Sequence, residues 1–177
     1  NGFTRIDVDR SGGPRNGWIY VVAAEKNLAP AGSDPDVVLH RSIDGGTSWS
    51  AGVRVNQDAL NNGKYQWFPA IRVDETGGVN IVYYDDRNTA SDSSEIYFSR
   101  SIDGGVTFTD ALVSDHRFKP KTIGVSGIAT GYQGDYIGIT SGNGKLWPIW
   151  MDDRPGPDGL YQAWTTSIDL GPGITHT

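Results

Sequence analysis

A short pattern, Ser-x-Asp-x-Gly-x-x followed by an aromatic or apolar residue, occurs three times in this chain of 177 residues. The copies occupy residues 42–49, 101–108 and 167–174, and in the third copy an isoleucine replaces the ring. Their starts are separated by 59 and 66 residues. Similar units at such a period indicate a repeat architecture, in which one unit cannot bury its own apolar face and neighbouring units share a core.

The residue types of the pattern predict a tight turn between two strands. An aspartate can accept hydrogen bonds from N–H groups of its own turn, and the glycines supply positive φ angles. We expect the aromatic residue to pack beneath the turn and to begin the next strand. The residues with these structural roles are Ser42, Asp44, Gly46 and Trp49 in the first copy, Ser101, Asp103, Gly105 and Phe108 in the second, and Ser167, Asp169 and Gly171 in the third.

Apolar or alternating runs typical of β-strands precede every copy and recur at matching places in each unit. In the second unit the expected strands are residues 70–74, 79–84, 95–100 and 111–114, with a hairpin turn at 75–78. The corresponding runs are 4–9, 18–23, 36–41 and 53–56 in the first unit, and 136–140, 145–150 and 161–166 in the third. Four antiparallel strands are typical of a propeller blade, so we expect blades at about residues 1–60, 61–120 and 121–177.

The repeated turns resemble the Asp-box (BNR) repeats of sialidases and sialidase-like β-propellers, and the first two copies match at every defining position. The resemblance implies an all-β fold of three four-stranded antiparallel blades, which form part of a larger, six-bladed ring. It also implies that the turns lie on the face remote from the active site. Closed propellers have about four to eight blades. Three blades therefore need completion by the rest of a longer propeller chain or by a second copy of this chain, unless the fold is a different one.

Composition agrees with short strands and tight turns, since the chain has 24 glycines and 9 prolines. A net charge of −6 argues against a nucleic-acid partner and an anionic membrane surface. The sequence lacks an apolar run of roughly 18 residues, so we expect no membrane span. The absence of cysteine excludes disulfides and thiolate metal sites and leaves the compartment open.

Charged and aromatic residues gather where the second strand of a unit ends, on the face opposite the turns. Residues 83–87 read Tyr-Tyr-Asp-Asp-Arg, residues 150–154 read Trp-Met-Asp-Asp-Arg, and the first unit has Ala-Glu-Lys at 24–26. Aromatic rings can stack on sugars, and an arginine can bind a carboxylate bidentately. The candidate ligand-binding residues are Tyr84, Asp85, Asp86, Arg87, Trp150, Asp152, Asp153 and Arg154, with Trp67, Tyr132 and Asp135 from the segments that lead into first strands.

Asp85 and Asp152 are the candidate catalytic carboxylates, because paired carboxylates can cleave glycosidic bonds. The alternative interpretation is structural, with each Asp–Arg pair fixing the loop that follows its strand. The Asp-Asp-Arg trio recurs in consecutive units. Because a ring has one catalytic centre and not one per blade, this recurrence favours the structural interpretation.

The resemblance further implies that a sialidase site contains three arginines, a Tyr–Glu nucleophile pair and an acidic Asp. The first arginine of the family lies in a Phe/Tyr-Arg-Ile-Pro motif, whereas residues 67–72 here read Trp-Phe-Pro-Ala-Ile-Arg. Only Arg87 and Arg154 are expected on the functional face. This departure argues against catalysis by this chain alone, although further blades could carry the other residues.

We expect no cofactor and no metal site. His40, His116 and His176 are scattered, without a second ligand at metal-binding spacing, and are expected to be ordinary surface or strand residues. The loops 85–92 and 152–158 carry enough carboxylate and amide oxygen to leave Ca²⁺ as an alternative, but their spacing matches no EF-type loop.

Three hypotheses of function remain. The first, which we favour, is a non-catalytic, extracellular or secreted propeller segment that offers a glycan- or protein-binding or scaffolding surface. The second is part of a glycoside hydrolase of the exo-sialidase kind, whose active site is completed by other blades. The third is a structural repeat that serves assembly and binds no small ligand. One fold can serve all three functions.

Overall fold

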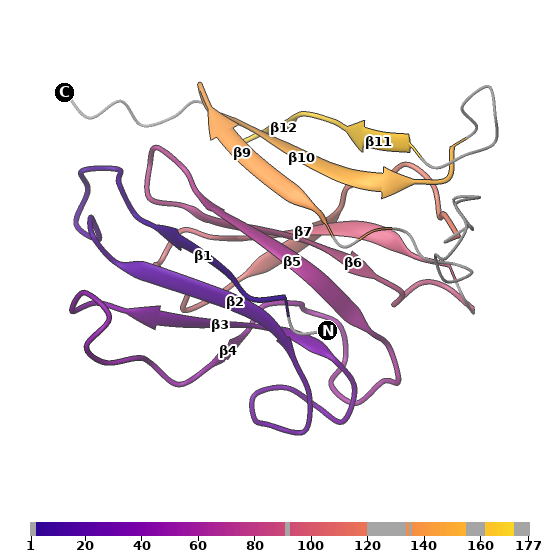
Figure 1. Ribbon diagram of the computed structural model, residues 1–177, viewed down its shortest axis with the longest axis horizontal. Coiled ribbons are helices and arrows are strands. Elements are labelled where there is room, and N and C mark those ends of the chain that lie inside the picture. Colours follow the sequence, from indigo (N-terminus) through magenta and orange to yellow (C-terminus); the bar gives the residue numbers. More distant parts are fainter. Residues whose placement is uncertain (1–2, 91–92, 120–133, 135, 155–161, 172–177) are drawn as a thin grey trace.

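The computed structural model describes residues 3–90, 93–119, 134, 136–154 and 162–171 (Figure 1). Its described part is all β, with twelve strands in three four-stranded antiparallel sheets and no helix. The first sheet has the order β1 (Arg5–Val8), β2 (Ile19–Glu25), β3 (Asp36–Ser42) and β4 (Val53–Arg54). The second has the order β5 (Gln66–Val73), β6 (Val79–Asp85), β7 (Glu95–Ser101) and β8 (Thr109–Leu112).

The third sheet is built around β10 (Lys145–Asp152). Strand β9 (Gly138–Gly142) pairs with one edge of β10, while β11 (Gln162–Thr165) and the short β12 (Ile168–Asp169) follow each other along the opposite edge. Both edges are occupied at Lys145, which has Gly142 and Asp169 as its partners. No helix within the described ranges is long and apolar enough to cross a membrane.

All eleven expected strands have a counterpart in the structure, with two informative differences. Strand β5 begins at Gln66, four residues earlier than the alternation predicts. Gln66 and Trp67 already pair with β6, and an irregularity between Trp67 and Ala70 separates them from the regular part of the strand. Within this irregularity Phe68 has a φ of 50°, a left-handed conformation that is rare for a bulky residue. Strand β12 was not expected, since it falls inside the third copy of the turn pattern.

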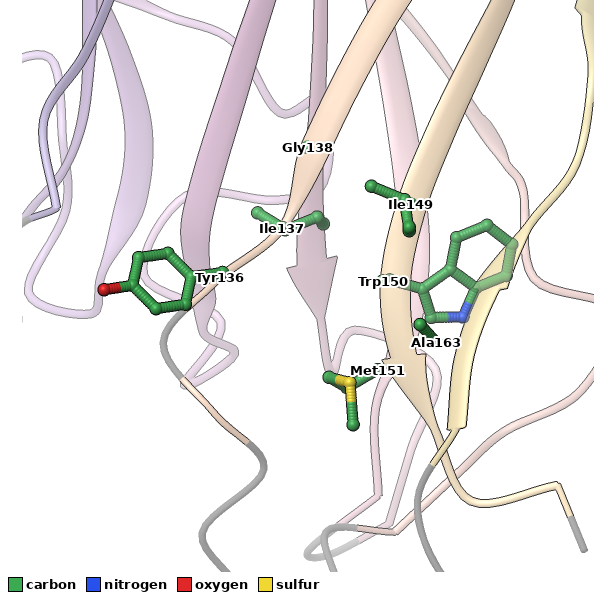
Figure 2. A pocket seen from close by; sticks show the side chains of 7 residues that line it. All are labelled: Tyr136, Ile137, Gly138, Ile149, Trp150, Met151 and Ala163. Atoms are coloured by element: carbon green, nitrogen blue, oxygen red, sulfur yellow. The ribbon is translucent and has the colours of Figure 1, made fainter. Parts of the chain in front are cut away.

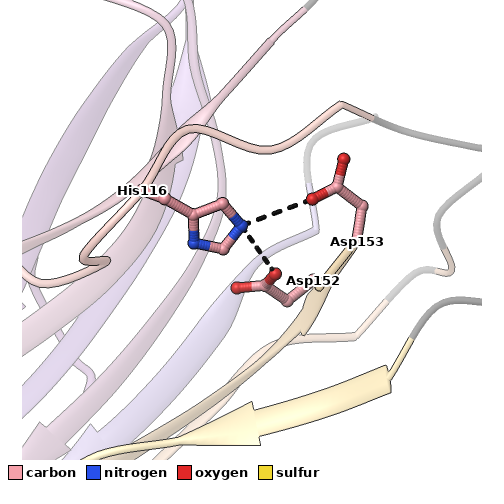
Figure 3. A group of neighbouring side chains, drawn as sticks. All are labelled: His116, Asp152 and Asp153. Carbon is pink, nitrogen blue, oxygen red and sulfur yellow. Dashed lines mark hydrogen bonds and ion pairs between the residues drawn. The ribbon is translucent and has the colours of Figure 1, made fainter. Parts of the chain in front are cut away.

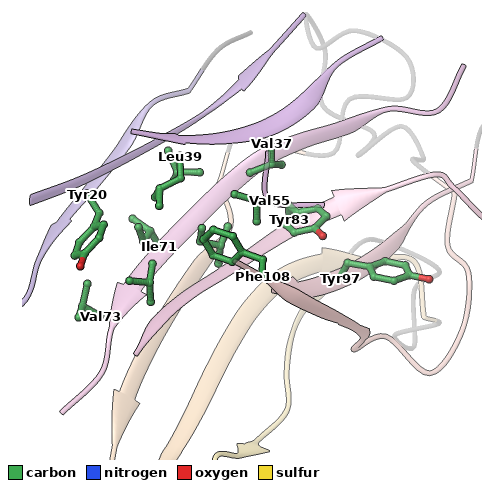
Figure 4. Packing of buried hydrophobic residues seen from close by; sticks show 12 residues of the cluster. Tyr20, Val37, Leu39, Val55, Ile71, Val73, Tyr83, Tyr97 and Phe108 are labelled. Carbon is green, nitrogen blue, oxygen red and sulfur yellow. The ribbon is translucent and has the colours of Figure 1, made fainter. Parts of the chain in front are cut away.

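The second sheet lies between the other two and is buried on both faces (Figure 1). Every residue of β6 is buried, and full burial of an aliphatic side chain stabilises by about 1.5–3 kcal/mol. Its contacts form one apolar cluster with the first sheet, drawn in Figure 4, and another with the third sheet. The first strands of neighbouring sheets also touch, since β5 contacts both β1 and β9.

The first two turns of the repeat have the predicted hydrogen bonds. In the second copy, the Ser101 hydroxyl donates to Asp103 Oδ1 over 2.7 Å, and the N–H of Thr107 donates to the same oxygen over 3.0 Å. The first copy has the same bonds, from Ser42 and from the N–H of Ser48 to Asp44.

The third copy is arranged differently. Ile168 and Asp169 pair with β10, and the Asp169 carboxylate accepts a hydrogen bond from Lys145 Nζ. The turn residues therefore serve as part of a strand in this unit.

The aromatic residues of the first two turns have different environments. Phe108 is only 7% exposed and belongs to the cluster between the first and second sheets, as expected. Trp49 is 46% exposed, so the expectation that it packs beneath its turn is wrong for this residue. The reason is that Phe108 faces the first sheet, whereas within the described residues no other sheet lies against the corresponding face of the first sheet.

Two turns of the second unit, the hairpin at 75–78 and the second copy of the repeat, are also held by residues of the first unit. Arg15 donates hydrogen bonds to the carbonyl groups of Gly77 and Ile102, and Arg41 donates to the carbonyl group of Gly104. A Cβ on Gly105 would lie 2.4 Å from Leu39 Cδ2. A glycine is therefore required at this place, for its φ of 82° and for the close approach of the two sheets.

Candidate functional site

The candidate carboxylates lie at the end of the sheets remote from the turns. Asp85 and Asp152 are the last residues of β6 and β10. The pairing of β6 with β7 places Asp85 opposite Glu95, while Val79, at the other end of β6, pairs with the turn residue Ser101. The expected separation between the turns and the second-strand ends is therefore present in the second sheet.

Asp85 is bound to Arg87 and has no exposed surface. The backbone N–H of Arg87 donates to Asp85 Oδ1 over 2.7 Å, and Arg87 Nε donates to Oδ2 over 2.8 Å. The guanidinium also donates to Asp110 and lies 3.9 Å from the ring centre of Tyr97. Although burial disfavours its charge, the hydrogen bonds with Asp85 and Asp110 raise the pKa of Arg87. Each charge of the pair thus has a partner within the protein, while burial outweighs the bonds with Arg87 and raises the pKa of Asp85.

Asp152 repeats this arrangement in the third sheet. It is fully buried and accepts hydrogen bonds from the N–H of Arg154 over 2.9 Å and from Arg154 Nε over 3.3 Å. Arg154 donates further to Asp115 and lies 4.1 Å from the ring centre of Trp164. The Asp-x-Arg segments therefore form the same local device twice, in which a buried carboxylate orients an arginine over an aromatic ring of the third strand.

The two aromatic candidates beside these pairs are also buried. Tyr84 is 1% exposed, and its hydroxyl accepts a hydrogen bond from the N–H of Met151, which links the second sheet to the third. Burial raises the pKa of Tyr84 to about 12. Trp150 donates from Nε1 to Asp152. Trp67 is half-buried and stacks on Tyr84, with ring centres 5.7 Å apart.

The second aspartates of the trios are partly exposed and contact the segments that approach them. Asp86 accepts a hydrogen bond from the N–H of Tyr65, and Asp153 accepts one from the N–H of Lys119. Tyr132 and Asp135, two further candidates, lie outside the described residues.

His116 contacts two of these aspartates, Asp152 and Asp153, although the sequence indicated no partner for it. His116 Nε2 lies 3.1 Å from Asp152 Oδ1 and 3.3 Å from Asp153 Oδ1 (Figure 3). One atom from each of these residues could contribute to a cation site, since the three atoms lie within 4.8 Å of one another. The Arg154 guanidinium, which already neutralises Asp152, opposes such a role. No spacing in the sequence could have found this cluster, because His116 is more than 30 residues away from the two adjacent aspartates.

The first unit has a different pair at the matching position. Glu25 is the last residue of β2, and its Oε1 lies 2.9 Å from His40 Nε2. No arginine follows at the second place, because the residue there is Asn27. The repeated Asp–Arg device is thus limited to the second and third sheets of the described chain.

Aromatic side chains lie where the first strands begin, at the same end of the sheets as the Asp–Arg pairs. Phe3 and Phe68 pack edge to face with ring centres 5.3 Å apart, and Phe68 also contacts Tyr84. Tyr65, just before β5, is 52% exposed, and Tyr136, just before β9, is 75% exposed. Phe3 and Phe68 were not identified as site residues from the sequence. The one signal near Phe68 is Pro69, which indicates an irregular strand at this place.

An apolar groove of about 300 Å³ lies beside Tyr136, on the face of the third sheet that points away from the second (Figure 2). Tyr136, Ile149, Met151 and Ala163 contribute to its lining. Its walls are largely apolar side chains, so it offers few hydrogen-bonding groups to a sugar.

No protein-family model matches the sequence, and no curated protein matches it. The chain is similar in structure to a Penicillium chrysogenum α-L-arabinanase complexed with arabinobiose, with a TM-score of 0.59 and 15% identity over 97% of this chain and 47% of that one. It is similar to a Hadza microbial sialidase, with a TM-score of 0.52 and 18% identity over 97% of this chain and 32% of that one.

A third similar structure is a protein of unknown function from Dyadobacter fermentans, with a TM-score of 0.53 and 18% identity over 87% of this chain and 35% of that one. The chain thus spans between about a third and a half of the length of these proteins. At such identities the likeness shows the fold alone. The fold is a sialidase-like or related propeller fold, without assignment to one family.

Proposed function

We propose that this chain is a non-catalytic carbohydrate-binding segment of a sialidase-like propeller. The observation that carries the proposal is the state of the two candidate carboxylates. Asp85 and Asp152 are fully buried, and each is bound by the arginine two residues later. A general acid or nucleophile must reach the glycosidic bond, and a buried carboxylate whose charge is already matched is unsuited to that role.

The ligand surface that we propose consists of the aromatic side chains at the same end of the molecule. Tyr65 and Tyr136 are exposed, and each precedes a first strand. Because β5 contacts β9, these strands bring the two tyrosines to the same end of neighbouring sheets. Flat rings at this end could stack on the apolar faces of sugar rings, as tyrosine does at many binding surfaces.

Calorimetric titration of the chain with arabino-oligosaccharides and with sialosides tests this function. We expect measurable binding and no release of sugar from the corresponding chromogenic glycosides. Loss of one stacking ring in Tyr65→Ala should raise the Kd about tenfold, because about 1.4 kcal/mol corresponds to that factor. Ile102→Ala is the control, since Ile102 is 74% exposed in the turn at the opposite end. Unchanged affinity in Tyr65→Ala, or turnover by the chain alone, would contradict the proposal.

The second candidate is a portion of a glycoside hydrolase whose active site needs further blades. It is favoured by the structural neighbours, which are named as an arabinanase and a sialidase. This candidate predicts that a longer form of the protein hydrolyses a glycoside. Activity that depends on Asp153 or Asp86, the partly exposed aspartates, would support it, provided that Asp153→Asn and Asp86→Asn retain the melting temperature of the parent.

A further inference from the structure

The three sheets repeat one register, which makes their faces comparable residue by residue. Three residues before the last residue of the second strand, a row of Cα partners crosses the first three strands. These rows are Arg5–Val22–Leu39, Ala70–Val82–Phe98 and Gly138–Ile149–Thr165. Val22 and Leu39 belong to the cluster between the first and second sheets, and Val82 belongs to the cluster between the second and third. Each sheet therefore uses the same face to contact the next sheet along the chain.

Among the residues that the structure describes, no further sheet covers this same face of the third sheet. Successive side chains of a strand point to opposite faces. Trp150 packs toward the second sheet, so its neighbours Ile149 and Met151 point outward into the apolar groove (Figure 2). Ile149 is 48% exposed, whereas the equivalent residues Val22 and Val82 have no exposed surface.

On the first sheet, the exposed residues lie on the other face, which points away from the second sheet. The row one residue earlier pairs Ile6 with Val21 in the first sheet and Ile71 with Ile81 in the second. Ile71 and Ile81 are 9% and 0% exposed because the first sheet covers them, whereas Ile6 is 64% exposed. Trp49 and Phe108 hold the same place in their turns, and again the residue of the first sheet is the more exposed, at 46% against 7%.

These two uncovered faces are the two halves of an interface that the chain already contains twice. We propose that a second copy of this chain docks head to tail, with its third sheet packed on the first sheet of its partner. A twofold assembly would form this contact twice and would cover the exposed Ile6, Trp49 and Ile149 of each copy. The resulting six sheets fall within the range of about four to eight blades at which propellers close. Trp49 would then occupy the groove side of the partner's third sheet, as Phe108 contacts the first sheet within the chain.

Light scattering coupled to size-exclusion chromatography tests the assembly, with Trp49→Glu and Ile149→Glu as variants. Both side chains are about half exposed within one chain, so we expect each variant to fold, which its circular-dichroism spectrum checks. We expect twice the mass of the chain for the parent and the mass of one chain for each variant. Ile102→Glu, on an exposed turn outside both faces, is the control and should keep the parent's mass.

A mixture of the two variants separates a head-to-tail contact from a symmetric one. In a mixed pair, the intact third sheet of the Trp49→Glu chain meets the intact first sheet of the Ile149→Glu chain. One of the two contacts is then restored, and we expect mixed dimers at raised concentration. A parent that stays monomeric, an open series of larger oligomers, or variants that remain dimeric would each overturn the proposal. Glycan binding by a monomeric parent would leave the proposed function standing while this inference fails.

Discussion

Asp44 and Asp103 stabilise their turns as carboxylates, because each accepts hydrogen bonds from backbone and hydroxyl groups. Bonds from the Ser48 hydroxyl and N–H, followed by the bond from Ser42, lower the pKa of Asp44 to about 2. Slight burial acts in the opposite direction on Asp103, but bonds from Thr107 and Ser101 outweigh it and lower its pKa further below the usual value. The sequence predicted this chemistry correctly for both residues, since every partner lies within four positions of the aspartate.

Stability should therefore depend on pH in the acid range. The pKa of both aspartates is lower in the folded chain than the value of about 3.9 expected for an unfolded chain. Their contribution is complete above that value and is lost as the pH falls through the folded pKa values. We expect the urea midpoint to be constant from about pH 7 to 5 and to fall between about pH 4 and 2.

Asp103→Asn provides the comparison for this pH dependence, because it removes the titrating carboxyl and keeps one acceptor oxygen. The variant should show a lower urea midpoint at pH 7 and a flatter decline below pH 4. A decline as steep as that of the parent would show that other carboxylates govern the acid transition.

At the scale of elements, the end of the second strand is the most instructive segment. The sequence showed that an Asp-Asp-Arg trio follows this strand in two units, and its recurrence favoured a structural role. The geometry of Asp85 with Arg87 and of Asp152 with Arg154 supports that interpretation. The sequence could not show that the arginines stack on Tyr97 and Trp164, because those rings belong to the neighbouring strand in each sheet.

Arg87→Ala should strongly destabilise the fold. It leaves Asp85 buried without its counter-charge, which costs about 3–5 kcal/mol for a buried pair. Lys145→Ala is the control, since the side chains of Lys145 and Asp169 are 43% and 73% exposed in their pair and such a pair contributes about 0–1 kcal/mol. Chemical denaturation at pH 7 measures both free energies of unfolding. Equal losses in the two variants would show that the Asp85–Arg87 pair is not a structural element.

Strand boundaries show where local patterns were insufficient. Strands β2, β3, β6 and β7 agree with the alternation of apolar residues to within two positions at each end. Strand β5 does not, because the irregularity at Phe68 lets the chain remain paired with β6 beyond the regular alternation. Strand β12 forms because Lys145 and Leu146 of β10 offer a free edge to residues that resemble a turn.

At the scale of the whole molecule, the number of neighbouring sheets that each sheet packs against should determine its local stability. The second sheet has a neighbouring sheet on both faces, whereas the first and third each pack on one neighbouring sheet within the described part of the chain. Amide protection against exchange follows the burial of apolar contacts. We therefore expect hydrogen exchange at low protein concentration to be slowest in β6 and faster in β1 and β11.

Exchange also reports on the proposed assembly. Protection of β1, β9 and β11 should rise with protein concentration as the outer faces become covered, while that of β6 should stay constant. The same rise should be absent in Trp49→Glu. Concentration-independent exchange in the parent, measured by mass spectrometry over a wide range of concentrations, would argue against a second copy.

The sequence by itself determined the β-rich repeat, the strand order within each unit and the chemistry of the first two turns. These features depend on residues close together along the chain, where side-chain alternation and glycine positions act directly. Only the tertiary structure decided that Asp85 and Asp152 are buried and bound by their arginines. It also decided that His116 contacts Asp152 and Asp153. Finally, it decided that Trp49 is exposed while Phe108 is buried. These outcomes depend on which sheet lies against which face, and that arrangement is set by contacts between residues far apart in the sequence.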